Sequence, residues 1–90
     1  MGYYYFKAGI NLLNYHKRKK LLCYLIENPN LIMIDESAGF TDLEPNFIVK
    51  NVNEFYQIMD DLMEKFPDTI QNYVYYHFKE IHKWRYLPDK

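Results

Sequence analysis

The residues best suited to recognise a ligand lie in a short turn and the segment before it. The turn at residues 39–44 reads Gly-Phe-Thr-Asp-Leu-Glu and separates two strand-like runs. Its glycine would let backbone approach a ligand closely and present exposed amides to an anion. Nearby carboxylate and hydroxyl oxygens would accept hydrogen bonds from a cationic group. The candidate ligand-binding residues are therefore Gly39, Phe40, Thr41, Asp42, Asp35 and Ser37.

A simpler interpretation of the same turn needs no ligand. Gly39 would permit a positive φ angle, and the Asp42 side chain would cap the turn by hydrogen bonding to nearby backbone. The residue types alone favour this structural role, and both interpretations place the turn in a hairpin between strands.

The other reactive side chains do not form a recognisable catalytic or metal site. His77 and His82 are five residues apart, so on a regular strand they would face opposite sides. The chain has no Gly-rich phosphate loop, nucleophile elbow or metal-ligand motif. We therefore predict no metal, no cofactor and no enzymatic activity.

The single cysteine and the absence of long apolar runs indicate a cytoplasmic protein. Cys23 alone cannot form an intrachain disulfide, which fits a reducing compartment. We expect it to be a partly buried structural thiol, because no histidine is placed to activate it. No apolar run reaches membrane-spanning length, and the N-terminus lacks the apolar core of a signal peptide.

Charge and aromatic clusters give little support to nucleic-acid binding by this chain itself. The formal net charge is −1, so there is no overall attraction to DNA, RNA or anionic membrane. The basic run at residues 16–20 spreads its cations around a helix, which is typical of a solvated surface. The tyrosine run at residues 73–76 is interpreted as an interface rather than a base-stacking platform, since a basic sheet surface is missing.

Hydrophobic periodicity predicts the elements that would position the turn. Residues 3–13 alternate as a strand, with Tyr4, Phe6, Ala8, Ile10 and Leu12 on the core face. Further strands are expected at residues 31–37, 43–50 and 70–81, the third with a bulge or a late start at Pro45. Helices are expected after the N-cap residues Asn14 and Asn51, ending near Glu27 and before Pro67.

These elements predict an α+β fold for the single domain spanning residues 1–90. The order is that of a ferredoxin-like βαββαβ sandwich, with a four-stranded antiparallel sheet and two helices on one face. The apolar residues expected to face the sheet are Tyr15, Leu21, Leu22, Leu25 and Ile26 in the first helix, and Val52, Phe55, Ile58, Met59, Leu62, Met63 and Phe66 in the second. Met33, Met59 and Met63 are expected to fill core gaps.

The composition predicts self-association. Hydrophobic residues make up 49% of the 90 residues and aromatic residues 19%, which is more apolar surface than one small sandwich can cover. We expect two copies to pack sheet against sheet or edge to edge. The predicted dimer-interface residues are Tyr3, Tyr5, Tyr73, Tyr75 and Trp84.

Five ordered segments resemble one known family. They are Phe6-Lys7-Ala8-Gly9-Ile10, Glu27-Asn28-Pro29, the turn at residues 39–44, Glu64-Lys65-Phe66-Pro67 and Tyr86-Leu87-Pro88. Together they span nearly the whole chain, and the chain resembles the C-terminal effector-binding and assembly domain of Lrp/AsnC (leucine-responsive regulator) transcription factors.

The resemblance implies properties that composition does not show. Such domains form dimers and assemble further into tetramers or octamers, and they bind amino acids between subunits with the Gly-x-x-Asp turn in the pocket. DNA would be bound only through a separate helix-turn-helix domain, which this chain does not contain. Two alternatives stay open, namely a small dimeric ferredoxin-like enzyme and a structural assembly module without a ligand.

Overall fold

The computed structural model describes residues 2–36 and 41–78, and it confirms the expected order of elements. A single 3-10 turn, η1, precedes the first helix and was not expected. The elements are β1 (Tyr4–Leu12), η1 (Tyr15–Lys17), α1 (Arg18–Ile26), β2 (Leu31–Asp35), β3 (Glu44–Val49), α2 (Val52–Lys65) and β4 (Ile70–Phe78).

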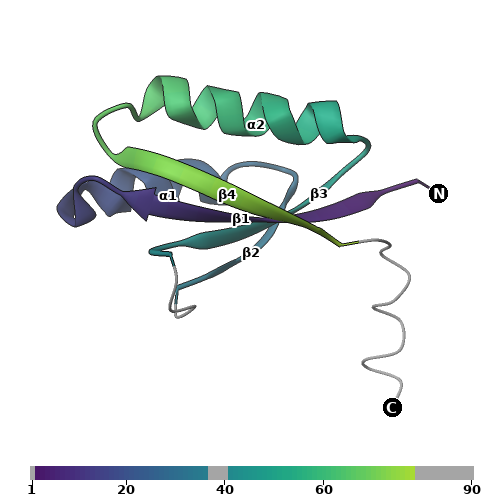
Figure 1. The fold of residues 1–90 in the computed structure, drawn as a ribbon, viewed down its shortest axis with the longest axis horizontal. Coiled ribbons are helices and arrows are strands. Elements are labelled where there is room, and N and C mark those ends of the chain that lie inside the picture. Colours follow the sequence, from purple (N-terminus) through teal and green to yellow (C-terminus); the bar gives the residue numbers. More distant parts are fainter. Residues whose placement is uncertain (1, 37–40, 79–90) are drawn as a thin grey trace, which may run out of the picture.

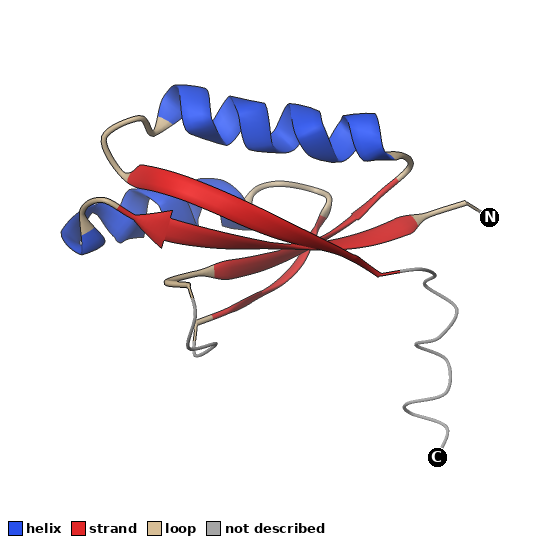
Figure 2. Ribbon diagram, in the orientation of Figure 1, coloured by secondary structure: helices blue, strands red, loops and turns tan. Residues whose placement is uncertain are grey.

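The four strands form one antiparallel sheet in the order β2-β3-β1-β4. Both helices lie on the same side of this sheet, and within residues 2–36 and 41–78 no helix or strand covers the other face (Figures 1 and 2). The ferredoxin-like α+β fold is therefore confirmed, while the dimer stays a prediction. Within the described residues, neither helix has the length and apolar character needed to cross a membrane.

The core lies between the sheet and the two helices. Phe6, Ala8 and Ile10 point from β1 toward the helices and are buried, as the alternation predicts. Phe6 stacks on Phe55 of α2 with ring centroids 4.5 Å apart, and Phe47 of β3 meets the edge of Phe55. An aromatic cluster of this kind adds roughly 0.5–1.5 kcal/mol per ring pair beyond area burial.

The first helix differs from its predicted apolar stripe. Leu21 and Leu25 are buried, but Tyr15 and Ile26 are exposed. Tyr15 lies in the 3-10 turn, whose three residues per turn put it out of phase with the α-helix that follows. Cys23 is exposed rather than partly buried, because it is two residues, about 200° of helical rotation, from Leu21.

The second helix begins as predicted. The Asn51 side chain accepts a hydrogen bond from the Glu54 backbone N–H at 2.9 Å, and the Glu54 carboxylate accepts one from the Lys50 N–H at 2.7 Å. These reciprocal bonds satisfy donors that the first turn leaves free. Phe55, Met59 and Leu62 are buried against the sheet, whereas Val52 is exposed.

The strand irregularity predicted at Pro45 lies elsewhere. Pro45 is inside β3 and pairs with Ile34, while the register shifts in β2 between Leu31 and Met33. The shift leaves Ile32 and Met33 exposed, so the prediction of Met33 as core filler is wrong. The bulge is therefore formed by an extra residue in β2, between Leu31 and Met33, and not by the proline in β3.

The register places alternate residues of the tyrosine run on opposite faces of the sheet. Tyr75 pairs with Ala8 and Tyr73 with Ile10, and paired residues share a face of the sheet. Tyr73 and Tyr75 therefore lie on the helix-covered face, where the Tyr75 hydroxyl is 2.8 Å from that of Tyr56. They cannot share the open face with Tyr5. Trp84, the fifth predicted interface residue, lies outside the described residues, and Tyr3 is exposed just before β1.

Candidate functional site

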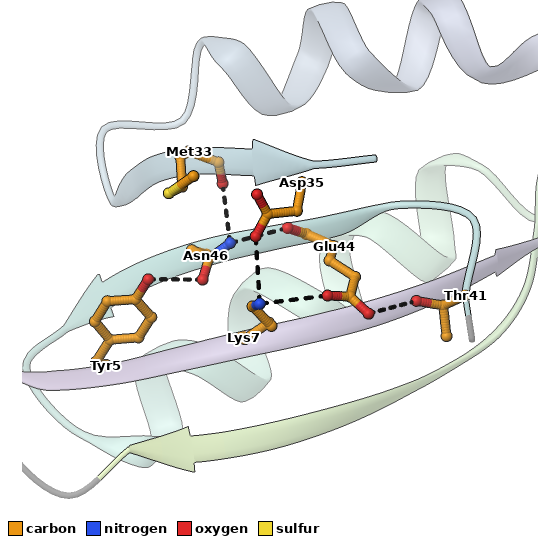
Figure 3. Close-up of polar contacts among 7 residues, drawn as sticks. All are labelled: Tyr5, Lys7, Met33, Asp35, Thr41, Glu44 and Asn46. Atoms are coloured by element: carbon orange, nitrogen blue, oxygen red, sulfur yellow. Dashed lines mark hydrogen bonds and ion pairs between the residues drawn. The ribbon is translucent and has the colours of Figure 1, made fainter. Parts of the chain in front are cut away.

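The side of the sheet opposite the helices carries a connected set of polar side chains (Figure 3). We call this set the open-face cluster; it consists of Tyr5, Lys7, Asp35, Thr41, Glu44 and Asn46. The residues come together because Lys7 of β1 pairs with Asn46 of β3, and Asp35 of β2 pairs with Glu44 of β3. Paired residues share a face, so three neighbouring strands place these side chains in one row.

Lys7 is the centre of the open-face cluster. Its Nζ atom lies 3.3 Å from Asp35 Oδ2 and 3.4 Å from Glu44 Oε1. The exposed side-chain fractions are 25% for Lys7, 36% for Asp35 and 9% for Glu44. Burial acts to lower the pKa of Lys7, but hydrogen bonding and attraction to the two carboxylates together raise it above its ordinary value. The lysine therefore stays charged, and one cation faces two anions.

Glu44 is held in place from two directions. Its Oε2 atom accepts a hydrogen bond from the Thr41 hydroxyl at 3.0 Å, while its Oε1 atom faces Lys7. The Thr41 side chain lies over Gly9 of β1, where an added Cβ would be 3.0 Å from Thr41 Cγ2 and 3.1 Å from Thr41 Oγ1. The missing side chain at Gly9 thus leaves the space that Thr41 needs to reach Glu44.

Tyr5 and Asn46 close the other end of the cluster. The Tyr5 hydroxyl donates to Asn46 Oδ1 at 2.7 Å, and the Asn46 amide donates to the backbone oxygen atoms of Glu44 at 2.9 Å and of Met33 at 3.4 Å. Burial, the largest influence, raises the pKa of Tyr5, so its phenol remains a donor at neutral pH. Asn46 is almost fully buried, and these bonds satisfy its amide.

The structure assigns different positions to the predicted ligand-binding residues. Asp35 and Thr41 belong to the open-face cluster. Asp42 is exposed, and its Oδ2 atom accepts a hydrogen bond from the Leu12 backbone N–H at 2.8 Å. The backbone N–H groups of Asp42 and Leu43 both donate to the Ile10 carbonyl. Asp42 thus ties this segment to β1, which differs from the predicted cap of its own turn because the bonded N–H belongs to another strand. Gly39, Phe40 and Ser37 lie outside the described residues.

Sequence reasoning missed two charged members of the cluster. Neither Lys7 nor Glu44 is among the predicted ligand-binding residues. A usable signal existed for Lys7, since a lysine that follows several aromatic residues within a strand is seldom buried without a partner. The partner itself depends on strand order, which the local pattern does not contain.

Comparisons with known proteins support the fold. The sequence matches no protein-family model, and no curated protein is significantly similar to it. Three solved structures have the same fold. The complex of the transcriptional regulator NMB0573 from Neisseria meningitidis with L-Met has a TM-score of 0.73 at 12% identity, over 86% of this chain and 50% of that one. E. coli AsnC has a TM-score of 0.75 at 12% identity, over 87% and 52% of the two chains. PH0061 has a TM-score of 0.69 at 11% identity, over 89% and 54%.

The chain therefore spans about half the length of each of these proteins. At such low identity the likeness shows a shared fold. The fold expected from the Lrp/AsnC resemblance is confirmed by structures that include transcriptional regulators.

Proposed function

We propose that this chain is an effector-binding and assembly domain of an Lrp/AsnC-type transcriptional regulator, and that it binds an amino acid or a similar zwitterion at a subunit interface. The fold likeness supports the regulator class, because one similar structure is a transcriptional regulator in complex with L-Met. The observation that carries the binding proposal is the half-buried Lys7 between two carboxylates, on the sheet face that no helix of the described residues covers.

The open-face cluster has the chemistry that a zwitterion needs. A free amino acid carries one ammonium and one carboxylate, and it requires an anion and a cation placed close together. Lys7 would bind the ligand carboxylate, while Asp35 and Glu44 would bind its ammonium. Because two anions face one cation, one negative charge remains in excess and favours the ammonium. Each existing ion pair would be exchanged for one to the ligand, so no buried charge would be left unpaired.

A second copy of the chain would complete the site. On the β4 side of the open face, Val74 and Tyr76 pair with Gly9 and Lys7, and their side chains are 48% and 49% exposed. A partner covering this apolar half would also reduce the contact of Lys7 with water. Ion pairs strengthen when water is excluded, so ligand binding and assembly would favour one another.

A thermal-shift panel of the twenty amino acids, at concentrations up to about 10 mM, tests the proposal. At least one should stabilise the wild-type chain, since a ligand at 100 times its Kd adds about 2.7 kcal/mol. Lys7→Gln should abolish this stabilisation. The matched control is Lys50→Gln, because Lys50 is exposed and none of the ion pairs among the described residues includes it.

Two results would contradict amino-acid binding at this site. One is the absence of stabilisation by any amino acid, which together with a dimer by light scattering would favour an assembly module without a ligand. The other is an unchanged stabilisation in Lys7→Gln, which would place the ligand elsewhere.

A further inference from the structure

A hollow lies on the helix side of the molecule, away from the open-face cluster. We call it the basic groove; its volume is ≈ 470 Å³. It forms where the start of α1 meets the connection from α2 to β4, two segments at the same end of the sheet (Figure 1). Its lining residues are His16, Lys17, Lys19, Lys20, Lys65, Phe66, Asp68 and Thr69.

The lining of the basic groove is strongly unbalanced in charge. Four lysines line the groove, and two carboxylates, Asp68 in its lining and Asp61 beside it, pair with Lys17 and Lys65, which leaves an excess of two positive charges with the histidine neutral. Lys17 is paired with Asp68 at 2.6 Å, and Lys65 with Asp61 at 2.6 Å. Lys19 and Lys20 take part in none of the ion pairs formed among residues 2–36 and 41–78. The whole chain has a net charge of −1, so this excess is a local concentration of charge.

The position of Lys19 and Lys20 within α1 also points to an anion partner. The first turn of this helix contains three consecutive basic residues, Arg18, Lys19 and Lys20, and no acidic residue. Cations at a helix N-terminus are repelled by the positive end of the helix dipole. Arg18 turns away and packs over the ring of Tyr15 at 4.0 Å, but Lys19 and Lys20 line the groove. Residues that destabilise their own helix are expected at functional sites, where a bound ligand compensates for the lost stability.

We propose that the basic groove binds a small molecule carrying two or more phosphate groups. A volume of ≈ 470 Å³ falls within the range of roughly 300–1,000 Å³ that is usual for small-molecule sites. Lysine ammonium groups bind phosphate as point charges, and several of them suit a polyphosphate better than a single phosphate. The half-buried ring of Phe66 adds an apolar wall beside these charges. The ion pairs of Lys17 and Lys65 hold two of the ammonium groups at the rim before the ligand arrives.

Calorimetric titration of the 90-residue chain with inorganic tripolyphosphate and with ATP tests this proposal. Binding is expected at low ionic strength and should weaken as salt increases. The double variant Lys19→Gln/Lys20→Gln should bind at least about tenfold more weakly, because two charge-assisted hydrogen bonds to the ligand are lost. Gln and Lys have similar helix propensities, so circular dichroism should show an unchanged fold.

Lys50→Gln, which removes one exposed cation outside the groove, should retain affinity close to that of the wild type. The proposal is overturned if the double variant binds tripolyphosphate as the wild-type chain does. It is also overturned if sulfate, titrated as its sodium salt at matched ionic strength, binds with the same affinity as tripolyphosphate. The groove would then bind anions without selecting polyphosphates. Binding of duplex DNA without binding of either polyphosphate would reassign the groove to nucleic-acid backbone.

Discussion

Removing Lys7 should destabilise the chain in a way that depends on pH. The substitution Lys7→Gln removes the only cation that the open-face cluster contains in the described structure and leaves the carboxylates of Asp35 and Glu44 facing one another. Glu44 retains its hydrogen bond from Thr41, but its side chain is 9% exposed, so water cannot replace the lost ammonium. An uncompensated charge in a buried position is the main source of the expected loss.

The magnitude follows from the burial of the three side chains. Breaking a fully buried ion pair costs about 3–5 kcal/mol, whereas an exposed pair is worth about 0–1 kcal/mol. Lys7 is 25% exposed and Asp35 is 36% exposed, so solvent screening reduces the first figure. We expect Lys7→Gln to lower the free energy of unfolding by about 1–2 kcal/mol at pH 7. Glu44→Gln in the same background should restore part of this loss, because the two charges interact directly.

The pH dependence has a definite sign. The pKa of Lys7 is raised in the folded chain, so its contribution is complete below the unfolded value of about 10.4 and is lost as pH rises through the folded value. The deficit of Lys7→Gln should therefore be full at pH 7 and pH 9. It should shrink only as the pH rises through the raised pKa of Lys7, where the wild-type chain also loses this charge.

Urea unfolding followed by circular dichroism at pH 7, at pH 9 and above the raised pKa of Lys7 measures these differences, with Lys50→Gln as the control for loss of a cation. Two results would refute the reasoning. One is a deficit at pH 7 no larger than about 0.5 kcal/mol, the usual limit for exposed substitutions. The other is strict additivity of Lys7→Gln and Glu44→Gln, which would mean that the two side chains do not interact.

Three further substitutions test the local geometry by urea unfolding. Gly9→Ala should destabilise the chain by about 1–3 kcal/mol, because the added methyl group would crowd Thr41. Adding Thr41→Ala should recover part of this loss. An unchanged stability of Gly9→Ala would contradict the close approach of Thr41 to Gly9. Asp42→Ala should lower the free energy of unfolding by about 1 kcal/mol, because the Leu12 N–H loses its acceptor. Asp42→Asn keeps an oxygen acceptor and should cause a smaller loss. Equal losses in the two variants would argue against this hydrogen bond. Asn51→Ala should destabilise by about 1 kcal/mol because α2 loses its N-cap, and an unchanged midpoint would disprove the capping role.

The fold could be predicted because its signals are local. The alternation of side chains in residues 3–13 predicted which face of β1 lies in the core. The three-residue spacing of Asn51 and Glu54 predicted the N-cap of α2. The predicted stripe of α2 was also largely right, with Phe55, Met59 and Leu62 buried. In each case the deciding physical property, side-chain periodicity or capping, acts within one element.

The errors concern properties that depend on more than one element. The face of Tyr73 and Tyr75 depends on the pairing register of β4 with β1, and a shift of one residue reverses every side chain. The open-face cluster needs three strands in the order β2-β3-β1, so Lys7 could not be linked to its two carboxylates from the sequence pattern. Tyr15 was predicted to lie on the apolar side of the first helix, but it belongs to the 3-10 turn before α1 and is rotated away from that side.

A titration of the labelled chain with amino acids, followed by backbone amide NMR, tests the proposed effector site most directly. Binding at the open-face cluster predicts that the largest shifts occur at Lys7, Asp35, Thr41 and Glu44, and that they disappear in Lys7→Gln. Shifts confined to the helices, or no shifts with any amino acid at about 10 mM, a concentration that would register any Kd in the millimolar range, would contradict the proposal.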